Sequence, residues 1–327
     1  MINLQEEEIN YVKQLYSKGY LPGPLECSCK SKIFNIYKDN QYKINSMSFR
    51  CANYLCRKKY GITCNSFFNK FSSQKIKTIC EIIKCFLCNE FNAKKTFDYI
   101  VNNYNVSISK NVIYNVFNEI RNVLIKFINI EYASNLLGEE GEQKYFAVDE
   151  CNIISIKGIQ IWLLGIIDTA SKDFRIEPVL NRDAETLKQF ITRNVAKGNF
   201  IITEGWAGYN FLDSNDSGYT RKRHDHGDSD FGYGRESTSH IESIWAQIRA
   251  KLKEIYHSIP HRNFMKFVRE IEFKIKIRDK SYSEKIQYFF DAFETNKTVN
   301  DSDIDFIDNY FYDSIANYLP DENYNDE

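Results

Sequence analysis

The stretch from Lys144 to Asp168 decides the fold. It reads Lys-Tyr-Phe-Ala-Val-Asp149-Glu-Cys-Asn-Ile-Ile-Ser-Ile-Lys-Gly158-Ile-Gln-Ile-Trp-Leu-Leu-Gly-Ile-Ile-Asp168. Residues 144–150 and 159–168 are apolar runs of strand length, and Gly158 marks the turn between them. After a second turn at Ser171-Lys-Asp, the run Phe174-Arg-Ile-Glu-Pro-Val-Leu has the same character. The sequence therefore predicts a meander of three strands.

The elements that follow this meander set the fold class. Residues 183–196 have helical spacing, and Asn199-Phe-Ile-Ile-Thr predicts a fourth strand that ends at Glu204-Gly205. A later helix is predicted over 239–256. A meander, a helix, a strand and a further helix follow one another in RNase H-like α/β domains. In that arrangement Asp149 ends the first strand, Glu204 ends the fourth, and the later helix brings Glu242 to them.

The later helix carries its polar groups beside an apolar stripe. Its start reads Ser237-Thr-Ser-His-Ile-Glu-Ser-Ile-Trp-Ala-Gln-Ile-Arg249. Glu242 and Arg249 lie two turns apart and point the same way, and Trp245 and Lys253 run along the same side as candidate DNA contacts. Ser239-x-x-Glu242 also fits a capping box, in which Glu242 closes the start of the helix. Capping and catalysis are both open for Glu242, and they are compatible.

Three converging carboxylates indicate metal-dependent chemistry. Close like charges resist joint ionisation, and a bound divalent cation removes that conflict. Mg²⁺ or Mn²⁺ held by Asp and Glu activates a water or a 3′-hydroxyl and stabilises the leaving oxygen of a phosphodiester. The order Asp149, Glu204, Glu242 therefore predicts a site for phosphoryl transfer.

The composition predicts a globular, intracellular protein of several domains. The chain has 327 residues, of which 43% are hydrophobic and 15% are aromatic. No apolar run has the length of a membrane span, and the first residues lack the pattern of a signal peptide. Nine cysteines in such a chain favour free thiols or metal ligands over a disulfide framework.

The charge is unevenly distributed along the chain. Residues 1–130 carry 19 Lys and Arg against 9 Asp and Glu, whereas residues 301–327 carry 9 acids and no Lys or Arg. A basic front half indicates a polyanion-binding region, and a solvated basic surface is the alternative. The acidic, Asn-rich end predicts a poorly ordered tail.

Four N-terminal cysteines resemble the ligands of a zinc ribbon. Cys27-Ser-Cys29 and the pair Cys51 and Cys56 are separated by β-prone segments. Four thiolates complete the closed tetrahedral shell of a structural Zn²⁺ site, which a small module with little core needs for folding. Cys64 is a spare ligand. Buried thiols without a metal are the alternative, because the spacings are not the C-x2-C repeat.

A helical region follows, and it has one segment typical of DNA recognition. Residues 73–127 have helical spacing, with Cys80, Cys85 and Cys88 as core residues. Val106-Ser-Ile-Ser-Lys-Asn-Val-Ile-Tyr-Asn-Val-Phe resembles the turn and second helix of a helix-turn-helix. Its exposed candidates for DNA contact are Lys110, Asn111 and Tyr114. A three-helix packing unit without a ligand is the alternative.

A basic, Gly-rich segment lies between the fourth strand and the later helix. It begins at Arg221 and ends at Arg235, and we predict a loop near the carboxylates. The candidates for contacts to DNA phosphates are Arg221, Lys222, Arg223, His224 and His226. His224-x-His226 is a weaker candidate for a metal pair. Asp225, Asp228 and Asp230 are possible substitutes for Glu204 as metal ligands.

Four blocks together resemble Merlin-like DDE transposases. They are Val148-Asp-Glu, Ile161-Trp-Leu-Leu-Gly-Ile-Ile-Asp, Lys197-Gly-Asn-Phe-Ile-Ile-Thr-Glu-Gly-Trp with Gly208-Tyr, and Thr238-Ser-His-Ile-Glu-Ser-Ile-Trp. Pro260-x-x-Asn-Phe with Val268-Arg-Glu-Ile-Glu-Phe resembles the family's next helix, and the cysteine module resembles its zinc ribbon. The resemblance covers about residues 25–280.

The resemblance implies roles for single residues. Asp149 is the first metal-binding acid, Glu242 is the third, and the second falls on Glu204, where the family has Asp. Arg249 stands where the family usually has Lys, and it keeps the charge. The implied activity is cut-and-paste transposition, with strand cleavage at transposon ends and transfer to target DNA. The implied setting is nuclear, with Mg²⁺ or Mn²⁺, structural Zn²⁺ and a homo-oligomer on DNA.

We therefore expect four segments. They are a zinc-ribbon-like module at 1–70, a helical DNA-binding domain at 71–138, an RNase H-like DDE domain at 139–290 and an acidic tail at 291–327. Because Glu204 replaces the aspartate of the family, an inactive copy of the transposase is a further possibility. The alternatives are a non-catalytic, transposase-derived DNA-binding protein and an RNase H-like nuclease acting on other nucleic acids.

Overall fold

The computed structural model describes residues 4–41, 45–90, 92–104, 106–156, 158–224, 237–255 and 264–300. The chain forms two compact units. The first comprises Met1–Ile120 with Lys280–Glu294, and the second comprises Arg121–Asp279 with Thr295–Glu327. None of the described helices combines the length and the apolar character that a membrane span requires. Residues 301–327 of the predicted tail lie outside the described part of the chain.

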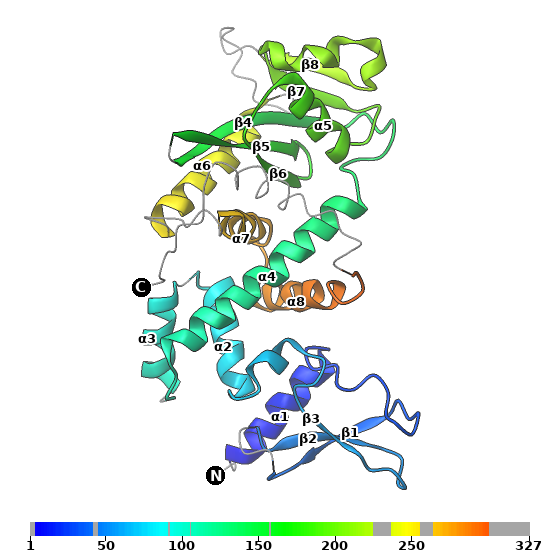
Figure 1. Ribbon diagram of the computed structural model, residues 1–327, viewed down its shortest axis with the longest axis vertical. Helices are drawn as coiled ribbons and strands as arrows, with labels where there is room; N and C mark the ends of the chain where they lie inside the picture. Colours follow the sequence, from blue (N-terminus) through cyan, green and yellow to red (C-terminus); the bar gives the residue numbers. More distant parts are fainter. Residues whose placement is uncertain are drawn as a thin grey trace. The chain divides into compact units, whose positions relative to one another are not determined.

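The first unit combines a small sheet with helices (Figure 1). The sheet is antiparallel and has the order β1-β2-β3. The elements are α1 (Leu4–Ser17), β1 (Phe34–Lys38), β2 (Met47–Cys51), β3 (Lys59–Gly61), η1 (Phe67–Phe71), α2 (Ile76–Leu87), α3 (Ala93–Tyr104), α4 (Lys110–Ser134) up to Ile120, and α8 (Tyr282–Thr295) up to Glu294. The β-prone segments and the helical region predicted from the sequence are therefore both present.

Aromatic side chains form the core of this unit. Tyr20 stacks on Phe290 of α8 at 4.0 Å, and Phe67 meets Phe289 edge-on at 5.2 Å. Helix α8 therefore packs with the N-terminal elements, whereas we assigned residues 282–290 to the catalytic segment. The core prediction for the α2 cysteines is confirmed at Cys80 and Cys85, which are buried, while Cys88 is half-buried.

The second unit is built on a five-stranded mixed sheet with the order β6-β5-β4-β7-β8. Strands β4, β5 and β6 are antiparallel neighbours, whereas β7 pairs parallel with β4, and β8 pairs parallel with β7. This is the strand order of an RNase H-like fold, as predicted. The strands are β4 (Tyr145–Ile156), β5 (Ile159–Asp168), β6 (Phe174–Val179), β7 (Phe200–Glu204) and β8 (Thr220–His224).

Two features of this sheet correct the sequence interpretation. Strand β4 runs to Ile156, so Asp149 lies inside the strand and does not end it. Residues 220–224 form the edge strand β8, not part of a loop. Its sequence, Thr-Arg-Lys-Arg-His, has no apolar alternation, so backbone pairing with β7 holds the strand in place.

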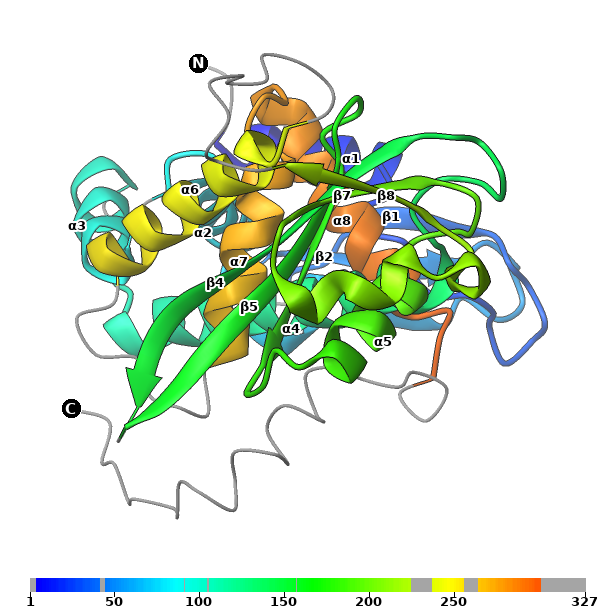
Figure 2. The ribbon, with the colours of Figure 1, turned by 90° about the horizontal axis from the view of Figure 1, so that it is seen from above.

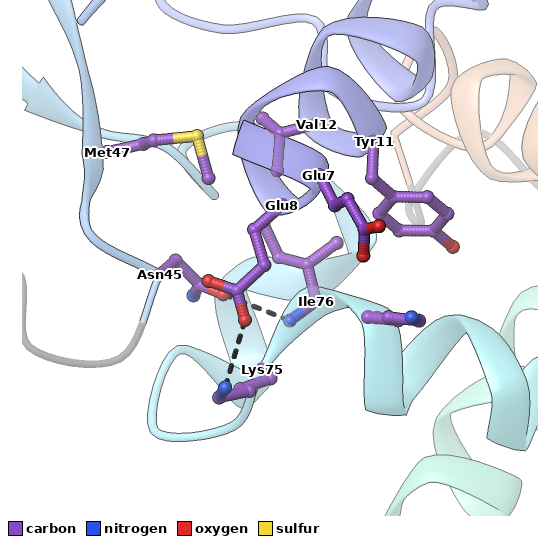
Figure 3. Close-up of a pocket in the computed structure, with 9 residues that line it drawn as sticks. Glu7, Glu8, Tyr11, Val12, Asn45, Met47, Lys75 and Ile76 are labelled. Atoms are coloured by element: carbon purple, nitrogen blue, oxygen red, sulfur yellow. Dashed lines mark hydrogen bonds and ion pairs between the residues drawn. The ribbon is translucent and has the colours of Figure 1, made fainter. Parts of the chain in front are cut away.

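Helices cover both faces of the sheet (Figures 1 and 2). One face packs on α5 (Ala184–Asn194), and Phe146 and Val148 of β4 point to that side. The other face packs on α6 (Ser239–Ile255) and α7 (Phe264–Lys276), and Ala147 and Cys151 point there. Because successive strand residues alternate between faces, Asp149 shares the α6 face and Glu150 the α5 face.

Buried charges anchor α7. Arg269 is fully buried, and its guanidinium donates to Glu272 Oε2 at 2.7 Å and to the backbone oxygen of Ile176 in β6 at 2.7 Å. Tyr132 in the C-terminal half of α4 donates to Glu272 Oε1 at 2.6 Å. Buried charges are tolerated when they are paired and hydrogen-bonded, so this network fixes α7 against the edge of the sheet.

Candidate active site

Asp149 lies where β4 separates from β7. The parallel pairing of these strands ends at Ala147 and Ile202, two residues before Asp149 and Glu204. Trp245 of α6 reaches Asp149, and its indole Nε1 donates a hydrogen bond to Oδ2 at 2.9 Å. Burial raises the pKa of Asp149 to about 6, and repulsion from Glu150 and Glu204 adds to the shift. The carboxylate is therefore oriented by α6 and surrounded by like charge.

A glycine makes this contact possible. Gly165 of β5 lies directly opposite Asp149 in the sheet. A methyl group added there would lie 2.4 Å from Cη2 of Trp245 and 2.7 Å from Cδ1 of Ile241. The missing side chain therefore leaves room for the indole beside the acid.

We expect Gly165→Ala to destabilise this unit by about 1–3 kcal/mol, the usual cost of overpacking a core. Urea unfolding followed by tryptophan fluorescence measures this, because Trp162, Trp206 and Trp245 all lie in the second unit. Gly61→Ala is the control, since an added Cβ meets nothing within 4 Å there. Equal midpoints for the two variants would show that α6 adapts without cost.

Glu204 ends β7, as predicted, and lies near two other acids. Its charge contributes to the raised pKa values of Asp149 and Glu150, although burial is the larger cause for both. Glu150 points to the opposite face, where the Tyr209 hydroxyl donates to Oε2 at 2.6 Å. We call Asp149 and Glu204 the acidic pair. Glu150 is not included, because it is bound by Tyr209 and Arg182.

Glu242 is exposed in the first turn of α6. The predicted capping box does not form, because α6 begins at Ser239 and the preceding Thr238 occupies the cap position. The backbone oxygen of Thr238 accepts from the Glu242 amide at 3.2 Å, and the Thr238 hydroxyl donates to Glu242 Oε1 at 3.4 Å. Two turns later, Arg249 donates to the backbone oxygen of Asn152 in β4 at 3.3 Å.

The structure brings the three acids together only in part. Asp149 and Glu204 interact, and Glu242 lies one turn from Trp245, which binds Asp149. Within the described ranges, the three acids do not form a group whose ligand atoms all lie within 4.8 Å of one another. The three acids therefore lie in one region of this unit, as predicted from their order in the sequence. Their oxygen atoms are not close enough together to surround a metal ion.

Two predicted DNA contacts are wrong. Trp245 is 4% exposed and belongs to the core, where it packs over Gly165. The side chain of Arg221 is 2% exposed, and it donates to the backbone oxygens of Glu204 at 2.9 Å and Trp206 at 3.2 Å. These donors stabilise the turn after Glu204, so Arg221 is a structural residue.

The other predicted contacts on β8 and α6 have mixed positions. Lys222 is half-buried near the ring of Phe200, and Arg223 is exposed and pairs with Asp213. His224 ends β8, and Lys253 lies in the last turns of α6; their side chains are outside the described structure, as are residues 225–236. This undescribed range holds His226 and the three aspartates considered as substitutes for Glu204.

The helix-turn-helix candidates lie at the start of α4. Lys110, Asn111 and Tyr114 are all exposed, and Ser109 directly precedes the helix. The Lys110 ammonium lies 5.5 Å from the centre of the Phe97 ring. These positions leave the three side chains accessible, and their contact with DNA remains a prediction.

The four N-terminal cysteines converge. The Sγ atoms of Cys27, Cys29, Cys51 and Cys56 all lie within 4.8 Å of one another, with 3.6 Å between Cys27 and Cys56 and 3.5 Å between Cys29 and Cys51. Four ligands at about 2.3 Å from a tetrahedral Zn²⁺ have sulfur atoms at such separations. Hydrogen bonds from the Cys29 backbone and the Tyr60 hydroxyl lower the pKa of Cys27 to about 6, which favours the thiolate that a metal binds. Cys64, the spare ligand, lies outside the cluster.

Sequence reasoning missed a group on the α5 face. Arg182 pairs with Glu150 and lies between the rings of Trp162 and Trp206. These four residues form no recognisable motif in the sequence, because they come from different strands and loops. In the sequence, only the adjacent acids Asp149-Glu150 and the presence of two tryptophans could have pointed to this group.

The comparisons with known proteins concern this second unit. Residues 141–276 match the family model of the ISXO2-like transposase domain. The match spans less than half of the chain and contains β4 to β8, α5, α6 and α7. It supports a DDE-type transposase-like domain here, consistent with the position of Asp149, Glu204 and Glu242 in an RNase H-like fold. No curated protein matches the chain.

Solved structures that resemble this transposase-like domain are distant. A chain of the simian T-cell lymphotropic virus intasome in complex with PP2A regulatory subunit B56 gamma has 9% identity and a TM-score of 0.30, and the match covers 58% of this chain and 66% of that one. The BIV integrase catalytic core domain has 9% identity, a TM-score of 0.31, and coverage of 54% and 99%. The HTLV-2 integrase catalytic core domain in complex with magnesium has 12% identity, a TM-score of 0.27, and coverage of 44% and 87%. The fold assignment therefore rests on the strand order.

Proposed function

We propose that this protein is a Merlin-like DDE transposase that cleaves DNA strands at transposon ends and transfers them to target DNA. Its partners are transposon-end and target DNA, it acts in the nucleus, and it assembles as a homo-oligomer on DNA. The observation that carries the proposal is the acidic pair Asp149 and Glu204, with Asp149 bound by Trp245 one turn after Glu242. Its setting in a domain that matches an ISXO2-like transposase model supports it further.

The donor set suits a divalent cation. Asp149, Glu204 and Glu242 offer only carboxylate oxygens, which Mg²⁺ and Mn²⁺ prefer. Asp149 is largely buried beside two like charges, an arrangement that a cation relieves. A divalent ion held by these three acids supplies charge neutralisation and a more acidic water or 3′-hydroxyl at the phosphodiester. Zn²⁺ at the four cysteines has a purely structural role.

The surrounding residues position the acids and the DNA. The Trp245 N–H donates to one oxygen of Asp149 and so orients the carboxylate. Arg221 holds the backbone that follows Glu204 through two carbonyl oxygens. The exposed guanidinium of Arg249, two turns beyond Glu242, contacts DNA phosphates with its remaining donors.

The experiment compares two DNA substrates of equal length in Mn²⁺. One carries the sequences that flank the coding region, and the other is unrelated plasmid sequence. We expect strand nicks at defined positions in the first only. Equal cutting of both would favour an RNase H-like nuclease of low specificity. An absence of cutting in both wild type and Glu204→Asp would contradict the proposal.

A non-catalytic DNA-binding protein is the second candidate function. The exposed Lys110, Asn111 and Tyr114, the cysteine cluster and the basic charge of residues 1–130 favour it, and none of them depends on the acids. In this case DNA affinity falls steeply with salt and is unchanged by Glu242→Ala. Fluorescence anisotropy of labelled duplex DNA over a salt series measures both properties.

A further inference from the structure

We propose that Arg182, which lies between Trp162 and Trp206, binds a backbone phosphate of the DNA. This inference rests on the proposed function, because it assigns a phosphate-binding residue for the same DNA to the same domain. It concerns the α5 face of the sheet, where Glu150 points, and not the α6 face that carries Asp149.

The position of Arg182 follows from the order of the strands. Glu150 lies on β4, Trp162 on the neighbouring β5, and Trp206 directly after β7, the neighbour on the other side. The Arg182 Cζ atom lies 4.1 Å from the ring centre of Trp162 and 4.7 Å from that of Trp206. Next-but-one strands are about 10 Å apart, which is the space for one guanidinium between two rings. The guanidinium thus lies across β4 with an indole on each side.

The guanidinium contacts two indoles and one carboxylate. Its Cζ atom lies near both rings, and the Nη1 atom donates to Glu150 Oε1 at 3.2 Å. Within the described ranges, Glu150 is the one hydrogen-bond acceptor of Arg182, and the side chain is 43% exposed. A guanidinium has five N–H donors in one plane, so several remain for a ligand oxygen. A phosphate is the ligand that matches this planar fork.

The surroundings of Arg182 are held rigidly near Glu204. Trp206 follows Glu204 by two residues, and Arg221 binds the backbone oxygens of both. Tyr209 meets the Trp206 ring edge-on at 5.9 Å and donates to the second oxygen of Glu150. A cation preorganised in this way loses little freedom when a DNA strand binds.

A second arginine in this unit, Arg193, forms an ion pair whose role is structural, and it serves for comparison with Arg182. Arg193 of α5 is 45% exposed and pairs with buried Glu177, much as Arg182 pairs with Glu150. However, both Nε and Nη2 of Arg193 bind the two oxygens of Glu177. Arg193 therefore gives two donors to its own partner, whereas Arg182 gives only one. Arg193 is the matched control.

The test measures DNA binding by the full, zinc-loaded chain without added Mg²⁺ or Mn²⁺. The variants are Arg182→Gln and the double variant Glu150→Gln/Arg182→Gln, with Arg193→Gln and Glu177→Gln/Arg193→Gln as controls. Each double variant keeps the net charge and leaves no buried carboxylate unpaired, so it folds even where the single variant does not. Fluorescence anisotropy of a labelled mixed-sequence duplex over a salt series gives the affinity and its salt slope.

We expect the two Arg182 variants to bind DNA roughly tenfold more weakly at about 0.15 M salt, as for one charge-assisted contact. The slope of log K against log salt should fall by about 0.9, the value for one phosphate contact. The Arg193 variants should match the wild type. Equal affinity and slope in both double variants would overturn this inference alone. A wild type that binds no DNA would overturn the proposed function as well.

Discussion

Replacing Glu204 by aspartate is expected to raise the rate of Mn²⁺-dependent DNA nicking by roughly a hundredfold. Glutamate is one methylene longer than aspartate, and displacing a reacting group by about 1 Å costs about this factor. The transposases that the sequence resembles have aspartate at this position. The β7 backbone before Glu204 is paired on both sides, and Arg221 holds the turn after it, so the backbone does not shift to absorb the extra length. The shorter side chain should therefore place its oxygens better.

The measurement is single-turnover nicking of DNA that carries the flanking sequences. Asp149→Asn in the Glu204→Asp background is the control, and it should show no cutting, because it removes the charge that Trp245 orients. A Glu204→Asp variant slower than the wild type would show that this site works with glutamate. The inactive-copy hypothesis would then have no support from this residue.

The second large effect concerns the four cysteines. We expect the wild type to hold one Zn²⁺ per chain and Cys29→Ser to hold none. Removing one thiolate opens the closed shell, and structural zinc in small modules contributes apparent free energies of about 10–16 kcal/mol. Residues from Cys27 to Gly61 should then lose their amide protection, because β1, β2 and β3 form a sheet of only three short strands.

Metal analysis and hydrogen exchange measure these two results. Cys64→Ser is the matched control, because Cys64 is half-buried like Cys29 but lies outside the cluster. It should keep the zinc and the protection. If the wild type contains no zinc and the strands are still protected, the buried-thiol alternative holds for this module.

The elements of the second unit follow largely from local patterns. Apolar runs of strand length at 159–168 and 174–180 form β5 and β6, and the helical spacing after Ser239 forms α6. These patterns suffice because each element must bury the apolar side that its own sequence provides. The prediction that Glu204 ends the fourth strand is confirmed for the same reason, since polar Glu204-Gly205 follows an apolar run.

Strand β8 could not be predicted in this way. Arg221, Lys222 and Arg223 have the composition of an exposed loop, yet they pair along the whole of β7. Main-chain hydrogen bonds do not depend on side-chain polarity, so an edge strand leaves little trace in the sequence. The burial of Arg221 has the same origin, because its donors are satisfied by carbonyl oxygens that only the folded turn presents.

The sequence by itself predicted the elements of the second unit other than β8, the three candidate acids and the four cysteines, since these follow from residue type and spacing. Only the tertiary structure decided which side chains meet. Trp245 is buried and not a DNA contact, because Gly165 on another strand leaves room for it beside Asp149. Arg182 meets Glu150 because β5 and the turn after β7 bring Trp162 and Trp206 next to its guanidinium. Periodicity is a local property, whereas these contacts join residues far apart in the chain and are set by the packing of the whole sheet.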